Sequence, residues 1–141
     1  MSNKEKFTAY VDTSVSADDT KQKINQLLKK YGVKQVAWRW DAPYSAEMSF
    51  PIQNVVVRIP VSKKLPFVQG MRALFWHLKT WFEELALDMP AEQVFMPYIV
   101  IRGQNGALTT IVQAELPRIR QSMLKSKDFP MLVNVKELKK I

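Results

Sequence analysis

The longest amphipathic pattern in this chain lies between residues 65 and 87, and it limits the kind of fold that the chain can adopt. Apolar residues recur there at intervals of three and four, as on one side of a helix. They form one wide arc: Val68, Met71, Leu74, Phe75, Leu78, Trp81, Phe82 and Leu85. Because an arc of this width needs a sheet face or several helices to cover it, we expect this helix to be the centre of the core.

Three short segments rich in β-branched and aromatic residues precede this helix, at 35–41, 46–52 and 54–61. We predict that they form an antiparallel meander. A two-residue turn at Gln53 and Asn54 would pair Ile52 with Val55, Phe50 with Val57 and Met48 with Ile59. In that register the large apolar residues lie on one face, and the other face holds Glu47, Ser49 and Arg58.

The first hairpin of this meander has a less obvious register. Simple symmetric pairing across the link 41–45 would place Trp38 and Trp40 opposite Ser49 and Glu47. Either a bulge near Pro43 corrects the register or both Trp residues face outward. We predict the bulge, because two exposed Trp side chains invite aggregation. Arg39 would then share the outer sheet face with Arg58, as a shallow basic strip that could follow a single-stranded backbone.

The N-terminal part of the chain carries a strand signal and a helix signal. Residues 6–13 alternate between apolar and polar, as in a half-buried strand. Ser16 with Asp19 makes a capping box that opens a helix over 17–31, and Gly32 supplies its end.

After the long helix, we predict a short turn at 90–93 and a strand at 94–101. Asn105-Gly106 predicts a hairpin to a short strand at 107–109. Thr110 with Gln113 predicts a helix to about residue 124, which Pro117 either kinks or starts. Residues 126–141 are either a basic edge strand, centred on 131–135, or a mobile tail. No internal repeat is present.

These elements predict an α+β fold, with an antiparallel sheet of three to five strands packed on the long amphipathic helix and two further helices completing the cover. The length of 141 residues and the apolar content of 47% are those of one globular domain, which we expect to span residues 1–141.

The sequence offers little support for an enzyme. It contains no Cys, no P-loop and no nucleotide-binding glycine motif, and its serines lack the context of a hydrolase nucleophile. His77 is the one histidine, and Glu83, Glu84 and Asp88 resemble a solvated helix face more than a Mg²⁺ site. We therefore predict no catalytic residue, no metal and no cofactor. The chain has neither a signal-peptide pattern nor an apolar run of membrane-spanning length, so we expect a cytoplasmic protein without a membrane partner.

Positive charge is concentrated at the two ends of the sequence. Residues 1–34 carry seven basic residues against four acidic ones, and residues 113–141 carry seven against three, whereas residues 66–112 carry three against four. Basic side chains near a polyanion release its counterions, which favours nucleic acid as the partner, although a basic surface can also serve solubility alone. The candidate phosphate contacts are Lys21, Lys23, Lys29, Lys30, Arg39, Arg58, Arg118, Arg120 and the basic C-terminal segment.

Trp76 is the unusual residue of the long helix. It lies outside the apolar arc, at three- and four-residue spacings from Arg72, Lys79 and Thr80. Arg72, Trp76 and Lys79 are therefore a candidate partner-binding site, or a place where a base stacks. The alternative is that Trp76 packs against the C-terminal helix.

Four segments together resemble a known group of proteins. They are I-N-Q-L-L-K-K-Y-G at 24–32, L-F-W-H-L-K-T-W-F-E at 74–83, E-Q-V-F-M-P-Y-I-V at 92–100 and N-G-A-L-T-T at 105–110. The chain is similar, over roughly residues 8–115, to short proteins encoded in bacteriophage and prophage genomes, a group without a known activity. The resemblance implies a viral or prophage origin and a bacterial cytoplasm, and it transfers no site residue. In layout alone, the chain is also similar to the core of phage single-strand annealing proteins.

Charge and resemblance together predict a non-enzymatic phage-type accessory protein that binds nucleic acid, with single-stranded DNA or RNA favoured. One alternative is a protein-interaction module that binds or inhibits a host protein through Trp76 and its neighbours. Another is a virion or assembly component. A homo-oligomer is compatible with all three.

Overall fold

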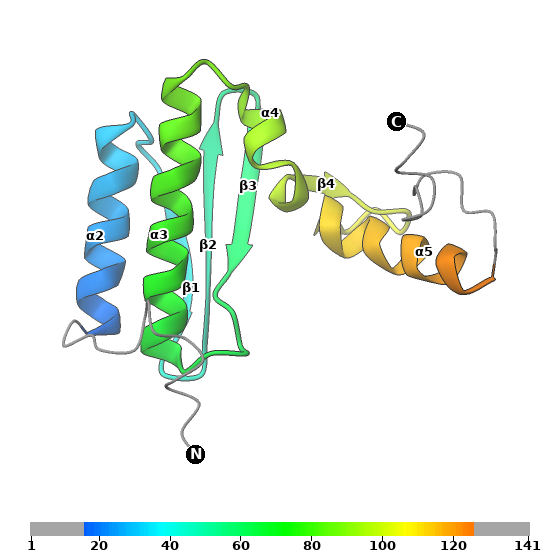
Figure 1. Ribbon diagram of the computed structural model, residues 1–141, viewed down its shortest axis with the longest axis horizontal. Helices are drawn as coiled ribbons and strands as arrows, with labels where there is room; N and C mark the ends of the chain where they lie inside the picture. Colours follow the sequence, from blue (N-terminus) through cyan, green and yellow to red (C-terminus); the bar gives the residue numbers. More distant parts are fainter. Residues whose placement is uncertain (1–15, 126–141) are drawn as a thin grey trace, which may run out of the picture.

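The computed structural model describes residues 16–125, with side chains to residue 122. The strand predicted at 6–13 and the segment 126–141 lie outside the described residues. Two helices cover one face of a three-stranded antiparallel sheet, and a smaller unit made of a hairpin and a helix extends to one side (Figure 1). The predicted α+β class is confirmed.

Helix α2 (Ala17–Lys30) begins and ends where its sequence signals indicate. The Ser16 hydroxyl oxygen accepts a hydrogen bond of 3.1 Å from the backbone N–H of Asp19, which satisfies one free donor of the first turn. Gly32 follows the helix with φ of +85°, a conformation that glycine adopts without a steric penalty. The helix buries Thr20, Ile24 and Leu28.

The sheet contains β1 (Ala37–Asp41), β2 (Ser45–Ile52) and β3 (Val55–Pro60), in that spatial order. The β2–β3 register is the predicted one, with Ile52 opposite Val55, Phe50 opposite Val57 and Met48 opposite Ile59. Met48, Phe50, Val57 and Ile59 are buried beneath the helices, which confirms the predicted core face.

The β1–β2 register differs by one residue from simple symmetric pairing. Trp38 lies opposite Met48 and Trp40 lies opposite Ala46. The strand pairing is continuous, so the predicted bulge is absent from it; the one-residue shift comes instead from a three-residue link between the paired Asp41 and Ser45. Both indoles therefore lie on the core face, half-buried, as predicted, and Arg39 projects from the outer face.

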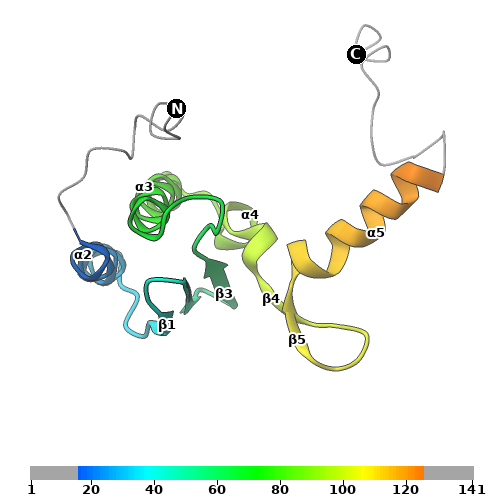
Figure 2. The same cartoon turned by 90° about the horizontal axis from the view of Figure 1, so that it is seen from below.

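Helix α3 (Phe67–Ala86) is the centre of the core, as its apolar arc predicts. It buries Met71, Leu74, Leu78 and Phe82. Helices α2 and α3 lie side by side over the same face of the sheet (Figure 2). They also run in the same direction (Figure 1).

The chain from 91 to 102 corrects the sequence prediction. Instead of a strand over 94–101, it forms helix α4 (Ala91–Val94), the 3₁₀ turn η2 (Met96–Tyr98) and strand β4 (Val100–Arg102). Phe95 is fully buried, and its ring lies 5.6 Å from those of Phe50 and Phe82. Anchoring this side chain in the core turns the backbone inward, so tertiary packing overrides the local strand preference.

Strand β5 (Leu108–Thr110) pairs with β4 across the predicted Asn105-Gly106 turn. This hairpin is a separate two-stranded sheet, and within residues 16–125 one isolated bridge, between Val57 and Ile99, connects it to the main sheet. The three-stranded sheet therefore lies at the lower end of the predicted range.

Helix α5 (Ile111–Lys125) follows β5 directly. The Thr110 hydroxyl accepts from the Gln113 backbone N–H at 3.4 Å, as predicted, and Pro117 lies inside the helix. Helix α5 packs against η2 and β5, beside the β3 edge, and does not lie over a face of the three-stranded sheet (Figures 1 and 2). The expectation that the C-terminal helix completes the cover of that sheet is wrong.

Candidate nucleic-acid interface

The predicted phosphate-binding residues lie on three separate parts of the molecule. Lys21, Lys23, Lys29 and Lys30 belong to α2, Arg39 and Arg58 project from the outer face of the sheet, and Arg118 and Arg120 lie on α5. The sheet separates the second group from the helices α2 and α3 (Figure 2). These eight residues therefore do not form one continuous surface.

The outer sheet face is close to electrically balanced. Arg39 Nη1 lies 3.9 Å from Glu47 Oε1, and Arg58 Nη2 donates to Gln113 Oε1 at 3.5 Å. The strands also place Asp41 on this face, at register with Ser45. Two basic and two acidic residues offset one another here, so the predicted basic strip carries little net charge.

Arg118 and Arg120 are exposed on α5. Arg118 Nη1 lies 3.0 Å from Glu115 Oε2, one turn earlier on the same helix. An exposed pair of this kind contributes little to stability, but it reduces the charge available to a phosphate.

Lys21 points toward the sheet. Its Nζ lies 4.6 Å from the ring centroid of Trp40 and 5.7 Å from that of Trp38, in the geometry of cation–π contacts. Lys21 therefore helps to hold α2 against β1, a role that differs from the predicted phosphate contact.

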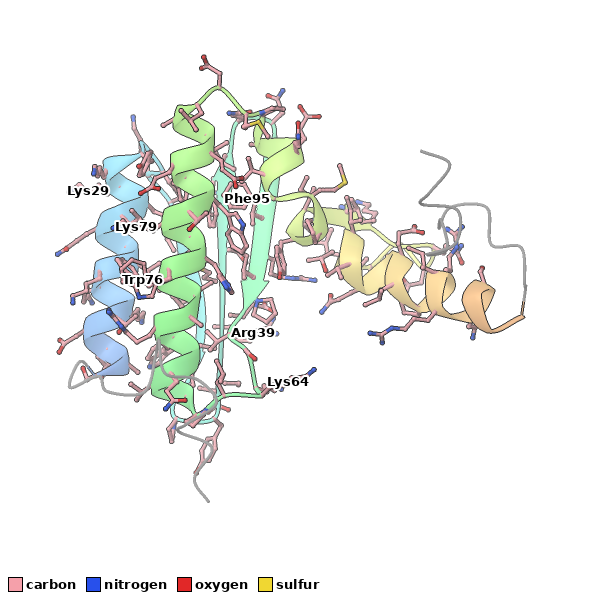
Figure 3. The ribbon with its side chains drawn as sticks, in the orientation of Figure 1. Lys29, Arg39, Lys64, Trp76, Lys79 and Phe95 are labelled. Atoms are coloured by element: carbon pink, nitrogen blue, oxygen red, sulfur yellow. The ribbon has the colours of Figure 1, made fainter. Side chains whose placement is uncertain are left out.

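Lys23 and Lys30 lie on the opposite flank of α2. On a helix with 3.6 residues per turn, Lys21 and Asn25 lie on one side of the buried stripe, and Lys23, Leu27 and Lys30 lie on the other. Since Lys21 and Asn25 contact the Trp residues of β1, the flank of Lys23 and Lys30 faces away from the sheet. Both lysines are exposed there. Lys29 is also exposed, farther round the solvent side (Figure 3).

The neighbouring flank of α3 carries Arg72, Phe75 and Lys79. Trp81 lies on the opposite flank of α3, and its ring contacts Phe95 and Tyr98. That flank of α3 therefore faces α4 and η2. On the side of α3 nearest to α2, Phe82 stacks on Tyr31, with ring centroids 5.1 Å apart. Figure 3 shows Trp76 and Lys79 on the α2 side of α3, toward the viewer.

We call the surface formed by these two flanks the α2–α3 strip: Lys23, Lys30, Arg72, Trp76 and Lys79. Lys23 and Lys30 are seven residues apart, as are Arg72 and Lys79, so each pair spans roughly 10 Å along its helix. Because the helices run in the same direction and Tyr31 lies beside Phe82, the two pairs lie at similar heights. Arg72 and Lys79 thus lie at the indole itself, and Lys23 and Lys30 lie on the facing flank of α2, where Lys30 Nζ is 5.8 Å from the ring centroid of Tyr31.

Trp76 is 41% exposed. Lys79 Nζ lies 5.0 Å from its ring centroid, and Arg72 Cζ lies 6.0 Å from it and 5.6 Å from the ring of Phe75. Helix α5 lies on the far side of the molecule, beyond β3 (Figure 1). Helix α5, which is the predicted C-terminal helix, therefore does not pack over Trp76, and that alternative is wrong.

The cations of the strip are not neutralised by ion pairs within the described part of the chain, where the pairs are Arg39–Glu47 and Arg118–Glu115. Arg72 Nη1 is buried and has no hydrogen-bond partner among residues 16–125. Asp19, in the first turn of α2, and Glu83, one turn beyond Lys79, bring negative charge near the two ends. The centre of the strip, around Trp76, remains positive.

Sequence reasoning identified each flank of the strip and missed that the two flanks meet. Helical spacing shows which residues share one side of a helix. The contact between α2 and α3 joins residues far apart in the sequence, such as Tyr31 and Phe82, and helical spacing cannot predict such a contact.

Comparisons with protein family models, curated proteins and solved structures give no match, so the resemblance to phage proteins stays a prediction. Among residues 16–125, no helix combines the length and apolar character that a membrane crossing requires.

Proposed function

We propose that this protein binds nucleic acid through the α2–α3 strip, as a non-enzymatic accessory protein. The observation that carries the proposal is that four cations, free of ion pairs within residues 16–125, share the strip with an exposed Trp76, which two of them contact. Lysine and arginine near phosphates release condensed counterions, which provides affinity for any sequence. Placing four such residues on one rigid pair of helices concentrates that effect in one place.

The test removes two charges from the strip and compares the effect with the same loss elsewhere. The variant Lys23→Gln/Lys30→Gln removes the two cations that α2 contributes to the strip. The control Lys63→Gln/Lys64→Gln removes two exposed lysines from the loop before α3, where Lys64 points away from the strip (Figure 3). Both double variants have the same net charge, so any difference between them reports position.

The measurement is affinity for a single-stranded oligonucleotide over a series of salt concentrations. Wild-type binding should weaken linearly with the logarithm of salt concentration. The strip variant should lose about 1.4 from that slope, roughly 0.7 per phosphate contact, and the loop variant should keep most of it. Equal losses in the two variants would mean that net charge alone causes binding.

A protein partner is the second candidate, and one observation favours it. Trp and Arg dominate the energetics of protein interfaces, and the strip presents an exposed Trp76 beside Arg72. This alternative predicts that Trp76→Ala abolishes capture of a protein from a bacterial extract, while the wild-type chain shows no salt-dependent binding to oligonucleotides.

A further inference from the structure

Trp76 lies outside the apolar arc and is 41% exposed, and the ring of Phe75 packs edge-on against its ring, with centroids 5.7 Å apart. One turn before Trp76 on α3 lies Ala73, which is buried, and one turn after it lies Thr80, which is exposed and whose hydroxyl donates a hydrogen bond of 3.1 Å to the Trp76 carbonyl oxygen. The other neighbours are the cations Arg72 and Lys79. An indole in this setting is a flat apolar surface with positive charge on either side of it.

A nucleotide has the complementary chemistry, because it joins a flat base to negative phosphates. We infer that Trp76 stacks on an unpaired base while Arg72 and Lys79 contact the phosphates on either side of it, which makes single-stranded nucleic acid the preferred ligand. This inference rests on the proposed function and assigns its ligand class.

The contact that Lys79 now makes with the indole is compatible with this role. Lysine carries its ammonium group on a flexible stem, so Nζ can leave the ring face when a base arrives. Its new partner would be a phosphate oxygen, which binds a cation more strongly than an aromatic ring in water does. The base then occupies the ring face that the ammonium group leaves.

A duplex cannot use the indole in this way. Its bases stack on one another, and their faces are not accessible without unpairing. The strip would contact a duplex through phosphates alone. Single strands should therefore gain affinity from Trp76, and duplexes should gain none.

The experiment compares oligothymidylate with an abasic oligomer of the same length, which has the same phosphates and no bases. Both are measured against the full-length wild-type chain and against Trp76→Ala, Trp76→Phe and Tyr44→Ala. Tyr44 is an exposed aromatic residue, 77% accessible, in the link between β1 and β2, so it controls for the loss of any exposed ring. Melting curves establish that each variant is folded.

Wild-type protein should bind oligothymidylate more tightly than the abasic oligomer. Trp76→Ala should weaken oligothymidylate binding by about 5- to 150-fold, the range for one stacked base, and leave abasic binding unchanged. Trp76→Phe should retain much of the preference, and Tyr44→Ala should retain all of it.

Equal wild-type affinity for the two oligomers would overturn the stacking role, and this comparison needs no variant to fold. If Lys23→Gln/Lys30→Gln still weakened both complexes in that case, the proposed function would stand without a role for Trp76. Absence of wild-type binding to either oligomer would instead overturn the proposed function together with this inference.

Discussion

The indole N–H of Trp38 donates a hydrogen bond of 2.9 Å to the side-chain oxygen of Asn25, which joins β1 to α2. One turn earlier on the helix, Lys21 lies over the ring of Trp40. These two polar contacts connect α2 to the edge strand β1 at a half-buried position. An apolar residue in place of Asn25 would leave the Trp38 N–H without a partner. They also fix which flank of α2 faces away from the sheet and carries Lys23 and Lys30.

The first prediction concerns this hydrogen bond. Replacing Asn25 with Ala leaves the half-buried Trp38 donor unsatisfied and should lower the free energy of unfolding by about 1–2 kcal/mol. Gln26→Ala, at an exposed position of the same helix, should change it by less than about 0.5 kcal/mol. Urea unfolding of both variants checks the prediction, and equal stabilities would show that the bond contributes nothing.

The second prediction separates two phenylalanines of α3. Phe82 is fully buried and lies against the rings of Tyr31, Phe50 and Phe95. Phe82→Ala should therefore cost about 3–5 kcal/mol. Phe75 belongs to the same apolar arc but is only half-buried, so Phe75→Ala should cost clearly less. Chemical denaturation measures both, and a larger loss at Phe75 would contradict the described packing.

Most of the main fold follows from local sequence signals. The Ser16 cap and Gly32 set the ends of α2, and the turn at Gln53 and Asn54 sets the β2–β3 register. Each signal acts between residues that are close in sequence, which is why it can be recognised there.

The errors arise where distant contacts override those signals. The segment 94–101 has the composition of a strand, yet burial of Phe95 among core rings turns its first half, residues 94–98, into the end of α4 and the 3₁₀ turn η2, and the strand begins only at Val100. Similarly, the α2–α3 strip depends on which flank of each helix faces the other. That is decided by the sheet beneath them, through contacts such as Lys21 with Trp40.

The third prediction concerns the close approach of α3 to the chain that follows β3. A Cβ added at Gly70 would lie 2.8 Å from Val61 Cγ1 and 3.0 Å from the Ser62 carbonyl oxygen. Gly70→Ala should therefore destabilise the fold by about 1–3 kcal/mol, although alanine ordinarily favours a helix. His77→Ala, at an exposed position of the same helix, is the matched control and should have little effect. A gain in melting temperature for Gly70→Ala would mean that the helix can move outward freely.

The last prediction distinguishes the two basic surfaces that the sequence suggests. Arg39→Gln/Arg58→Gln removes two charges from the outer sheet face, and Lys23→Gln/Lys30→Gln removes two from the strip. Arg39 already lies beside Glu47 and Arg58 is bonded to Gln113, so the first change should leave oligonucleotide affinity and its salt dependence nearly unaltered. The second should weaken binding and lower the salt slope by about 1.4, because it removes two cations without an acidic partner among residues 16–125. The reverse result, with binding lost only when Arg39 and Arg58 are neutralised, would place the interface on the sheet. Nucleic acid would then follow the exposed strand face, and Trp76 would have no contact with it.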